Sequence, residues 1–525
     1  MQNRRSPTHN LKNPFILIVA VIAIVTGVFF RLYNLDKRMF WYDETISANH
    51  ICGSTYGWYH LLEKGEPVEA IDLLAFQVPN QHHGLKDSIN SLIVLEPSHA
   101  PLYYCLLYFW AKFVGSSVAK LRLLSALISL LQIPAIFWLC FELSGAVYLG
   151  FLAMPLLALS PVLVIYAKET REYSLFPLAV IVLSASFLRA VRKQDLATWT
   201  AYSLILIFAL YTSPITFLVL SGQIIYILLQ KGIRWKGFRY FLIACLAAVV
   251  TYAPWLKVVW DHFNDASGSV QWLWRPMPLL QLSQIWYTNF ASPFFDPGNY
   301  CLAVQLLLGV TVLVVLYAGF ETCRKSPRVA KFLLVLIATN TIPFMICDLT
   351  FHWICSKPVR YQLAAIIGII VTVAYLFYVK LRKSAGLQGL IWKFAFCLLI
   401  LAEFVSCAIC SQATTWRELS TDSNCVAVAK ILNQEPETPL LVTDESWSHN
   451  ARHMLVISHM VKPTTRILLL KDPTIPKLEP GTTHFYTYHI APRFQEYLEN
   501  THQFTFSEAP DISDFKRVDC KQIEH

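Results

Sequence analysis

Charged residues are scarce in this sequence, and their scarcity excludes an ordinary soluble globule. Only 15% of the 525 residues are charged, whereas 55% are hydrophobic, and the mean hydropathy is +0.46. Soluble domains carry about 25% charged residues. A helix needs roughly 17–25 apolar residues to cross a bilayer core, and runs near this length recur, such as Pro14–Phe30, Phe241–Trp260, Cys301–Phe320 and Ala364–Val379. The bilayer is therefore the main solvent of the chain.

Several signatures of other protein classes are also missing. The sequence has no internal repeat, no low-complexity tract and no glycine-rich nucleotide-binding fingerprint. It has no N-x-Ser/Thr sequon, which agrees with a bacterial inner membrane and leaves the endoplasmic reticulum open. The 13 cysteines are scattered through apolar segments, which favours packing over a disulfide framework. We interpret Cys407 and Cys410, the only C-x-x-C, in the same way.

The net charge of +9 does not indicate nucleic acid, because the basic residues lie in short clusters between apolar runs. Cytoplasmic loops carry the Lys and Arg excess of membrane proteins, so these clusters assign sides. The first apolar run follows Arg4, Arg5 and Lys12 without a cleavage site, which predicts an uncleaved span and a cytoplasmic N-terminus. The other predicted cytoplasmic clusters are Arg189-Arg192-Lys193, Lys231-Arg234-Lys236-Arg239, Arg324-Lys325-Arg328-Lys331 and Lys380-Arg382-Lys383.

Because every basic cluster is assigned to the cytoplasmic side, an even number of spans must separate one cluster from the next. Residues 101–114 are too few for a span and suit an interfacial or re-entrant helix. We therefore predict an α-helical polytopic membrane protein with about eleven helices. The predicted spans are residues 14–30, 121–140, 145–163, 174–191, 198–212, 214–230, 238–259, 301–320, 331–348, 361–379 and 389–409.

The predicted domains are a membrane part, residues 1–410, and an extracytoplasmic part, residues 411–525. The first outer loop spans about 31–120, and the segments 166–173, 260–300 and 347–360 share its side. The tail is more polar, with strand-like runs and two helical segments that predict a small α/β domain. These are Leu440–Val442, Ile467–Leu470 and His484–Tyr488, with helices near Val426–Leu432 and Trp447–Ile457.

The first candidate site is the acidic pair Asp43-Glu44, which follows the first span beside Trp41 and Tyr42. A partly desolvated carboxylate near the membrane surface can act as a general base. Solvated acids in an interfacial aromatic belt are the alternative.

Two further motifs lie on the same predicted side. His99 opens the short apolar segment, where its imidazole can contact a phosphate or satisfy a backbone carbonyl. Between two spans, residues 166–173 hold a dense set of polar groups. An arginine beside a glutamate there can present its planar fork to a phosphate while the carboxylate orients it, or the charges can simply anchor the boundary. The polar groups include Tyr166, Lys168, Glu169, Arg171 and Tyr173.

Arg360, followed by Tyr361, stands at another outer boundary, where it can neutralise an anionic headgroup or snorkel. Trp272 and Trp274 can stack on a sugar ring or anchor the interface. Each motif alone is ambiguous, but the topology gathers acids, an imidazole and two guanidiniums on one face. A secondary transporter would instead place ionisable groups at the midplane between repeated halves.

The order of these motifs resembles the GT-C superfamily of integral-membrane glycosyltransferases, within it the family 39 group of protein mannosyltransferases and lipid A aminoarabinose transferases. The resemblance covers roughly residues 14–410. It rests on Arg31–Leu35, Asp43-Glu44, His99–Tyr104, Gly115 leading to Leu121–Ala126, and Ser160-Pro161 leading to Tyr166–Tyr173. Ala100 and Lys168 depart from the family pattern, which often has proline and glutamine there.

The resemblance implies that Asp43, with Glu44 beside it, is the catalytic carboxylate that takes a proton from the acceptor. It places His99, Arg171 and Arg360 near the phosphate of a polyprenyl-phosphate sugar donor, and Lys168, where the family often has glutamine, can add to phosphate binding. The supporting residues are Glu169, Tyr166, Tyr173 and Tyr361. A single displacement of this kind predicts inversion at the anomeric carbon, with a lipid, a glycan or a protein as acceptor.

Some questions stay open at the level of sequence. Asp43 and His99, with Glu44 and Glu96, offer ligands for a divalent metal, but no spacing matches a metal motif, and no cofactor is certain. The alternatives to a transferase are a transporter or flippase of an anionic lipid-linked substrate, and a non-catalytic membrane scaffold. We expect the active site and the C-terminal domain outside the cytoplasm, with membrane lipids as partners and no nucleic acid.

Overall fold

The computed structural model describes residues 14–79, 83–268, 270–298, 301–384, 386–416, 423–445, 450–476, 478, 482–501, 503–508, 512 and 514–520. By its internal contacts the chain divides into two compact units. The helical unit comprises Met1–Leu35, Glu96–Tyr103 and Leu121–Gln412, and the mixed unit comprises Asp36–Leu95, Tyr104–Lys120 and Ala413–His525.

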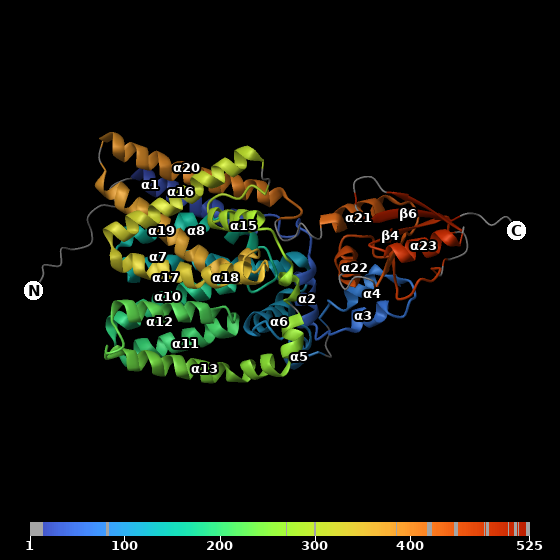
Figure 1. The fold of residues 1–525 in the computed structure, drawn as a ribbon, viewed down its shortest axis with the longest axis horizontal. Coiled ribbons are helices and arrows are strands. Elements are labelled where there is room, and N and C mark those ends of the chain that lie inside the picture. Colours follow the sequence, from blue (N-terminus) through green and yellow to red (C-terminus); the bar gives the residue numbers. More distant parts are fainter. Residues whose placement is uncertain are drawn as a thin grey trace, which may run out of the picture. The chain divides into compact units, whose positions relative to one another are not determined.

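The helical unit is built from the apolar runs of the sequence, and its long helices run alongside one another (Figure 1). Its elements are α1 (Pro14–Leu32), α7 (Val118–Ser144), α8 (Val147–Ala158), α9 (Pro161–Tyr166), α10 (Leu175–Lys193), α11 (Leu196–Thr212), α12 (Thr216–Gln230), α13 (Gly237–Asp261), α14 (Phe263–Gly268), α15 (Leu279–Ala291), α16 (Leu302–Lys325), α17 (Pro327–Thr339), α18 (Ile342–Phe351), α19 (Leu363–Lys383) and α20 (Gly386–Gln412), with the 3-10 turns η1 (Gln271–Trp274) and η2 (Val359–Gln362).

Within the described residues, eight helical stretches are long and apolar enough to cross a membrane. Three of the shorter apolar helices, α8, α11 and α12, correspond to the remaining predicted spans. All eleven predicted spans therefore have a helix, and the predicted polytopic helical fold class is confirmed. The predicted span 145–163 is broken at Leu159 and Ser160, because Pro161 cannot continue α8 and instead begins α9.

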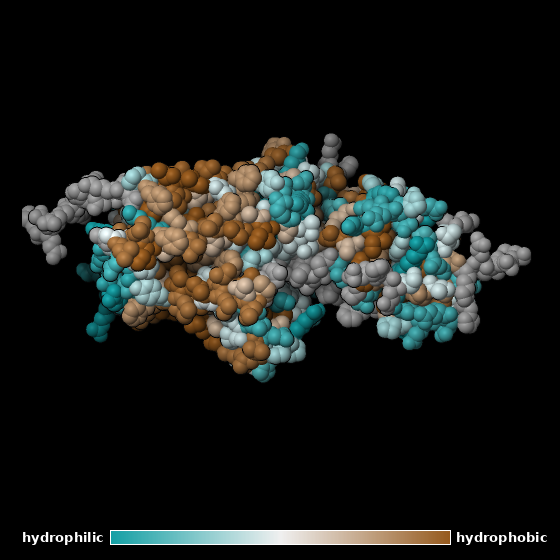
Figure 2. Space-filling view, turned by 90° about the horizontal axis from the view of Figure 1, so that it is seen from above, coloured by the Kyte–Doolittle hydropathy of each residue, from teal (hydrophilic) through white to brown (hydrophobic). Residues whose placement is uncertain are grey.

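The surface of the helical unit is dominated by apolar side chains. In Figure 2 hydrophobic residues cover much of this unit. Leu246 of α13, Leu313 of α16 and Phe394 of α20 are 64%, 66% and 68% exposed. Contiguous apolar surface of this kind is unfavourable in water and is the normal covering of a helix bundle in lipid. The chain is an integral membrane protein.

Helix α1 packs closely on the end of α8. A Cβ atom at Gly27 would lie 2.3 Å from the carbonyl oxygen of Ala158, so the helices can approach this closely only at glycine. The buried guanidinium of Arg31 donates to the carbonyls of Gly27 at 3.0 Å and Leu157 at 3.1 Å, and also to that of Ala158. Arg31 thus places its positive charge at the carbonyl end of α8, where the helix dipole favours a cation.

The mixed unit combines short helices with one sheet. Its elements are α2 (Tyr42–Ile51), α3 (Gly57–Leu62), β1 (Val68–Glu69), α4 (Ala70–Ala75), α5 (Leu85–Leu95), most of α6 (Leu102–Val114), α21 (Ser423–Gln434), β2 (Leu440–Asp444), α22 (Asn450–Ser458), β3 (Arg466–Leu470), β4 (His484–Tyr488), α23 (Pro492–Asn500), β5 (Phe504–Glu508) and β6 (Phe515–Cys520).

The sheet has the strand order β1-β3-β2-β4-β6-β5. Strands β2, β3 and β4 are parallel, and the other pairings are antiparallel. Alternate side chains point to opposite faces, so Val442 and Phe485 pack with Phe494 of α23 on one face. Helix α22 packs on β2 and on α21. The strand-like runs of the tail correspond to β2, β3 and β4, and the helix predicted near 447–457 corresponds to α22; its residues 447–449 lie outside the described residues.

Strand β1 comes from the predicted first outer loop. It pairs with β3, with Val68 opposite Ile467 and Glu69 opposite Arg466, and the Ala70 amide continues the ladder to the Thr465 carbonyl at 2.8 Å. A two-residue strand has no period of its own in the sequence. By contacts, residues 36–95 group with the C-terminal segment. The domain boundary at residue 410 stays a prediction.

Candidate active site

The turn between α9 and α10 brings charged groups into the helical unit. Residues 167–174 leave the helical conformation after α9, and the whole turn is buried. Such charges are tolerated only where they are paired and hydrogen-bonded. The partners come from the segment that precedes α6.

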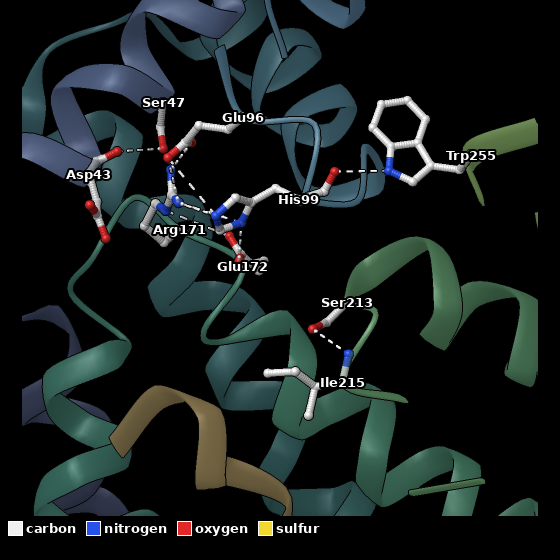
Figure 3. Close-up of polar contacts among 9 residues, drawn as sticks. All are labelled: Asp43, Ser47, Glu96, His99, Arg171, Glu172, Ser213, Ile215 and Trp255. Carbon is white, nitrogen blue, oxygen red and sulfur yellow. Dashed lines mark hydrogen bonds and ion pairs between the residues drawn. The ribbon is translucent and has the colours of Figure 1, made fainter. Parts of the chain in front are cut away.

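Arg171 is the centre of this cluster and is only 1% exposed. Its Nη1 lies 2.8 Å from Oε2 of Glu96, and its Nη2 lies 3.5 Å from Oε1 of the same carboxylate. Its Nη2 also lies 3.1 Å from Nε2 of His99, and its Nε lies 3.7 Å from Oε2 of Glu172. Figure 3 shows these four side chains pointing toward one another. A planar guanidinium fork suits this multiple contact better than an ammonium would.

His99 and Glu172 form the second pair of the cluster, with Nδ1 2.9 Å from Oε1. Burial and the positive charge of Arg171 lower the pKa of His99. The negative charges of Glu172 and Glu96 raise it by more, so the pKa of His99 lies above its ordinary value. Burial alone would raise the pKa of Glu172, but His99 and Arg171 lower it to about 2. With His99 protonated, two carboxylates balance two cations.

The backbone around the cluster is fixed by neighbouring helices. Trp255 of α13 donates from Nε1 to the carbonyl of His99 at 3.0 Å (Figure 3). Gln132 of α7 donates to the carbonyl of Ser174 at 2.7 Å. Tyr103 and Ser125 share a hydrogen bond of 2.7 Å. The charged side chains therefore project from rigid segments, as a precise binding site requires.

Arg360 lies in an aromatic surrounding. Its guanidinium carbon is 5.4 Å from the ring centres of Trp272 and Tyr361 and 5.7 Å from that of Tyr173. Cation–π contacts at such distances stabilise the charge without neutralising it. Because Tyr173 is also 5.9 Å from the guanidinium carbon of Arg171, one ring connects the two arginines.

A hydrogen-bonded network holds the segment before Arg360. Buried Asp348 accepts from the Ser356 amide at 3.2 Å, from Trp286 at 3.1 Å and also from the Ser356 hydroxyl. The Ser356 carbonyl accepts from Asn289 at 2.8 Å and from Gln362 at 2.9 Å. Ser356 is therefore fixed from both sides, four residues before Arg360.

The other predicted residues of the helical unit lie in the same turn. Lys168 is buried and donates from Nζ to the Tyr33 carbonyl at 2.9 Å. Glu169 is buried beside it. The rings of Tyr166 and Tyr173 meet edge to face at 5.2 Å. The structure thus brings all the predicted phosphate-side residues into one unit.

Asp43 and Glu44 belong to the mixed unit, in the first turn of α2. A helix N-terminus favours acidic side chains there. Glu44 is fully buried, and the Asp43 carbonyl accepts from the Ser47 hydroxyl at 3.0 Å (Figure 3). Helix α2 packs on α5, and His50 near its end contacts Ser91 of α5 at 3.1 Å.

The residues suggested for a metal are divided between the two units, with Asp43 and Glu44 in the mixed unit and Glu96 and His99 in the helical unit. No group of three or more His, Cys, Asp or Glu side chains suited to a metal ion occurs in the described part of the chain. Near His99, both Glu96 and Glu172 contact the Arg171 guanidinium, whose positive charge disfavours a cation. This cluster suits an anion better than a metal.

Comparison with known proteins places this architecture. The structure of ArnT from Cupriavidus metallidurans in the apo state matches with a TM-score of 0.53 and 12% identity, over 97% of this chain and 98% of that one. ArnT bound to undecaprenyl phosphate gives 0.51 with the same identity and coverage. The chain has a GT-C fold.

Other comparisons are weaker. The apo oligosaccharyltransferase from Archaeoglobus fulgidus is 12% identical, with a TM-score of 0.45 over 87% of this chain and 65% of that one. No protein-family model and no curated protein sequence matches the chain. The resemblance predicted from the ordered motifs is confirmed at the level of the GT-C fold.

The sequence predicted that a glutamate beside Arg171 orients it, but not which carboxylates pair with Arg171 and His99. Glu96 and Glu172 hold Arg171 and His99 in this GT-C fold, yet only their closeness in sequence to His99 and Arg171 pointed to them. Asp348 and Trp255 lie inside apolar helices and gave no signal beyond a polar or aromatic residue in an apolar run.

Proposed function

We propose that this protein is an integral-membrane glycosyltransferase that transfers a sugar from a polyprenyl-phosphate donor to an extracytoplasmic acceptor. The observation that carries the proposal is the cluster of buried Arg171 with part-exposed His99, next to Arg360, in a GT-C fold. Similarity to ArnT, which was solved with undecaprenyl phosphate, supports a donor of this class. A phosphate on a long apolar chain needs fixed cations at a membrane boundary.

The proposed reaction is a single displacement. The acceptor oxygen forms a bond to the anomeric carbon as the bond from that carbon to the phosphate oxygen breaks. The acceptor proton passes to the Asp43 carboxylate, and the polyprenyl phosphate leaves with the electron pair. Arg171, His99 and Arg360 would stabilise its charge, with Lys168 nearby, while Glu44, Glu169, Tyr166, Tyr173 and Tyr361 support the site. Attack opposite the leaving group inverts the anomeric carbon.

The proposed topology has the N-terminus in the cytoplasm and the site outside it, in a bacterial inner membrane. Two groups of ion pairs, each at the ends of neighbouring helices, support the assignment of the basic clusters to the cytoplasmic side. Glu142 pairs with Arg192 at 2.6 Å, and Glu321 pairs with Arg324 at 2.8 Å and Lys380 at 3.4 Å. These are residues of the basic clusters that the positive-inside rule assigns to the cytoplasm.

The decisive experiment is sugar transfer from a panel of radiolabelled polyprenyl-phosphate sugars to membrane extracts. The wild type should label an acceptor, and Asp43→Asn should lower transfer about 10²–10⁴-fold, because it removes a general base. Asp72→Asn is the matched control, since Asp72 is an exposed acid of the same unit.

Two outcomes would contradict this proposal. Equal transfer by wild type and Asp43→Asn would exclude Asp43 as the base. Uptake of donor lipid into vesicles without any transfer or donor hydrolysis would indicate the transporter or flippase instead.

A further inference from the structure

The residues that lead into α2 are held by the C-terminal segment of the same unit. The amide of Met39 donates to the carbonyl of Thr414 at 3.1 Å. The ring of Phe40 lies 4.8 Å from that of His459. The guanidinium carbon of Arg452 lies 4.6 Å from the ring centre of Tyr42. Three contacts therefore fall within the four residues that precede Asp43.

Two of these contacts come from α22 and the turn that follows it. Arg452 lies in the first turns of α22, and His459 directly follows its last residue. Helix α22 packs on both α2 and α4, and His459 also contacts Gln77 at 2.7 Å between Nε2 and Oε1. Helix α22 and His459 therefore contact the chain on both sides of α2, at Phe40 and Tyr42 where α2 begins and at Gln77 beyond it.

The residues that lead into α2 are packed in place. Phe40 and Trp41 are both buried. Farther along, Tyr59 donates to Glu445 at 3.0 Å, and Lys471 pairs with Glu63 at 2.8 Å. Together with the pairing of β1 and β3, these contacts join residues 39–71 and the C-terminal segment into one packed body.

We propose that the C-terminal domain is a positioning element for Asp43, acting through α22, with Arg452 and Tyr42 as its positioning residues. This inference rests on the proposed function. A general base works only within hydrogen-bond reach of its proton, so a small displacement of α2 lowers turnover without changing how the donor binds. The C-terminal domain would then contribute to kcat even though it contributes no reacting group.

The test compares Arg452→Met, Tyr42→Leu and their combination with the conservative variants Arg452→Lys and Tyr42→Phe. Arg452→Met should lower kcat about 3- to 10-fold with the donor KM unchanged, the range expected for loss of a cation–π contact. Tyr42→Phe should retain activity because it retains the ring. The double variant should be no worse than the more impaired single one, because both remove the same contact.

Hydrogen exchange of the α2 amides gives a readout that does not depend on turnover. Exchange over Tyr42–Ile51 should quicken in Arg452→Met and Tyr42→Leu. Arg517→Met is the matched control, since Arg517 lies on β6 and pairs with Asp519 at 2.9 Å; it should leave exchange in α2 unchanged.

The outcomes separate the two proposals. Unchanged exchange in α2 together with unchanged kcat in Arg452→Met would overturn the positioning role. Quickened exchange in a protein that transfers no sugar would support the structural role of α22 and overturn the proposed glycosyltransferase. A donor KM that rises as far as kcat falls would also overturn the inference, because it would indicate a binding role.

Discussion

At the scale of single residues, the buried charges of the helical unit depend on one another. Arg171 contacts Glu96, Glu172 and His99. Removing a buried member such as Glu172 leaves an uncompensated buried charge that costs about 3–5 kcal/mol. In its neutral form, His99 can accept from Arg171 at Nε2 while donating from Nδ1 to Glu172. Protonation makes Nε2 a donor, so the hydrogen bond from Arg171 to Nε2 is lost. In its place, the charged imidazole is attracted to the carboxylates of Glu96 and Glu172.

We expect the pH dependence of stability to report this cluster. The pKa of His99 is raised in the folded protein, so its stabilisation is complete below about pH 6.5 and is lost as the pH rises through the raised pKa. The melting temperature of the wild type in detergent should fall across that window, and His99→Gln should flatten the curve. His60→Gln is the control, because the His60 side chain is 68% exposed.

The acid side has the opposite sign. The pKa of Glu172 is lowered to about 2, so its stabilisation is present above its ordinary pKa of about 4.5 and is lost as the pH falls toward about 2.

For His99, the contradicting outcome is an equal slope of melting temperature against pH above pH 6.5 in wild type and His99→Gln. It would show that His99 does not couple to folding.

The sequence predicted which residues gather, but not how they pair. The positive-inside rule predicted that the segments of Arg171, His99 and Arg360 share one side of the membrane, and the family resemblance proposed these three residues for the phosphate. Their partners depend on side-chain geometry across distant segments. Glu96 and Glu172 could equally have faced solvent, and only the fold decides between those arrangements.

At the scale of elements, the segment between α18 and α19 fixes Arg360 by hydrogen bonds to Ser356. Asp348 accepts from Ser356 and Trp286, while Asn289 and Gln362 donate to the Ser356 carbonyl. A buried network of this kind is stable only when its members are satisfied together.

Asp348→Asn should therefore disturb Arg360 without touching it. An amide NH₂ would face donors where a carboxylate oxygen accepted, at a cost of about 1–3 kcal/mol. We expect a lower melting temperature and a donor KM raised about 3- to 10-fold, on the order of the same energy. Asp261→Asn, in an exposed pair with Lys257, should change neither quantity. A lower melting temperature with unchanged donor KM would limit Asp348 to a structural role.

The helices themselves were accessible from sequence, because apolar run length and charge clusters are local properties. Breaks within them were less so. Pro161 marks one break, but α17 ends at Thr339 and α18 begins at Ile342 inside a single predicted span, where Asn340 bonds to the Leu336 carbonyl at 2.9 Å.

At the scale of the whole molecule, each unit is assembled from separated stretches of chain. The mixed unit takes residues from the first outer loop and from the tail. Sequence composition separated the apolar part from the polar tail, but it gave no sign that β1 would join β3. Such pairing depends on contacts between residues far apart in the chain.

A designed cross-link tests this assembly. Because Ala70 and Thr465 share a ladder hydrogen bond, the next pair, Glu69 and Arg466, is of the closer, non-hydrogen-bonded type, which suits a disulfide. Glu69→Cys with Arg466→Cys should form the cross-link on mild oxidation, detected by peptide mass spectrometry, and should retain transfer. Glu69→Cys alone is the control against the native cysteines, and absence of the cross-link would contradict the pairing.

The position of β3 has a consequence for biosynthesis. Met39 and Val68 are translated before most of the membrane helices, whereas Thr414 and Ile467, which hold them, leave the ribosome only after those helices. The early loop must therefore wait for its partners, since distant contacts form late and slowly. Translation that stalls before β3 would leave a membrane-inserted chain whose α2 is unsupported, and quality-control proteases would meet the exposed loop first.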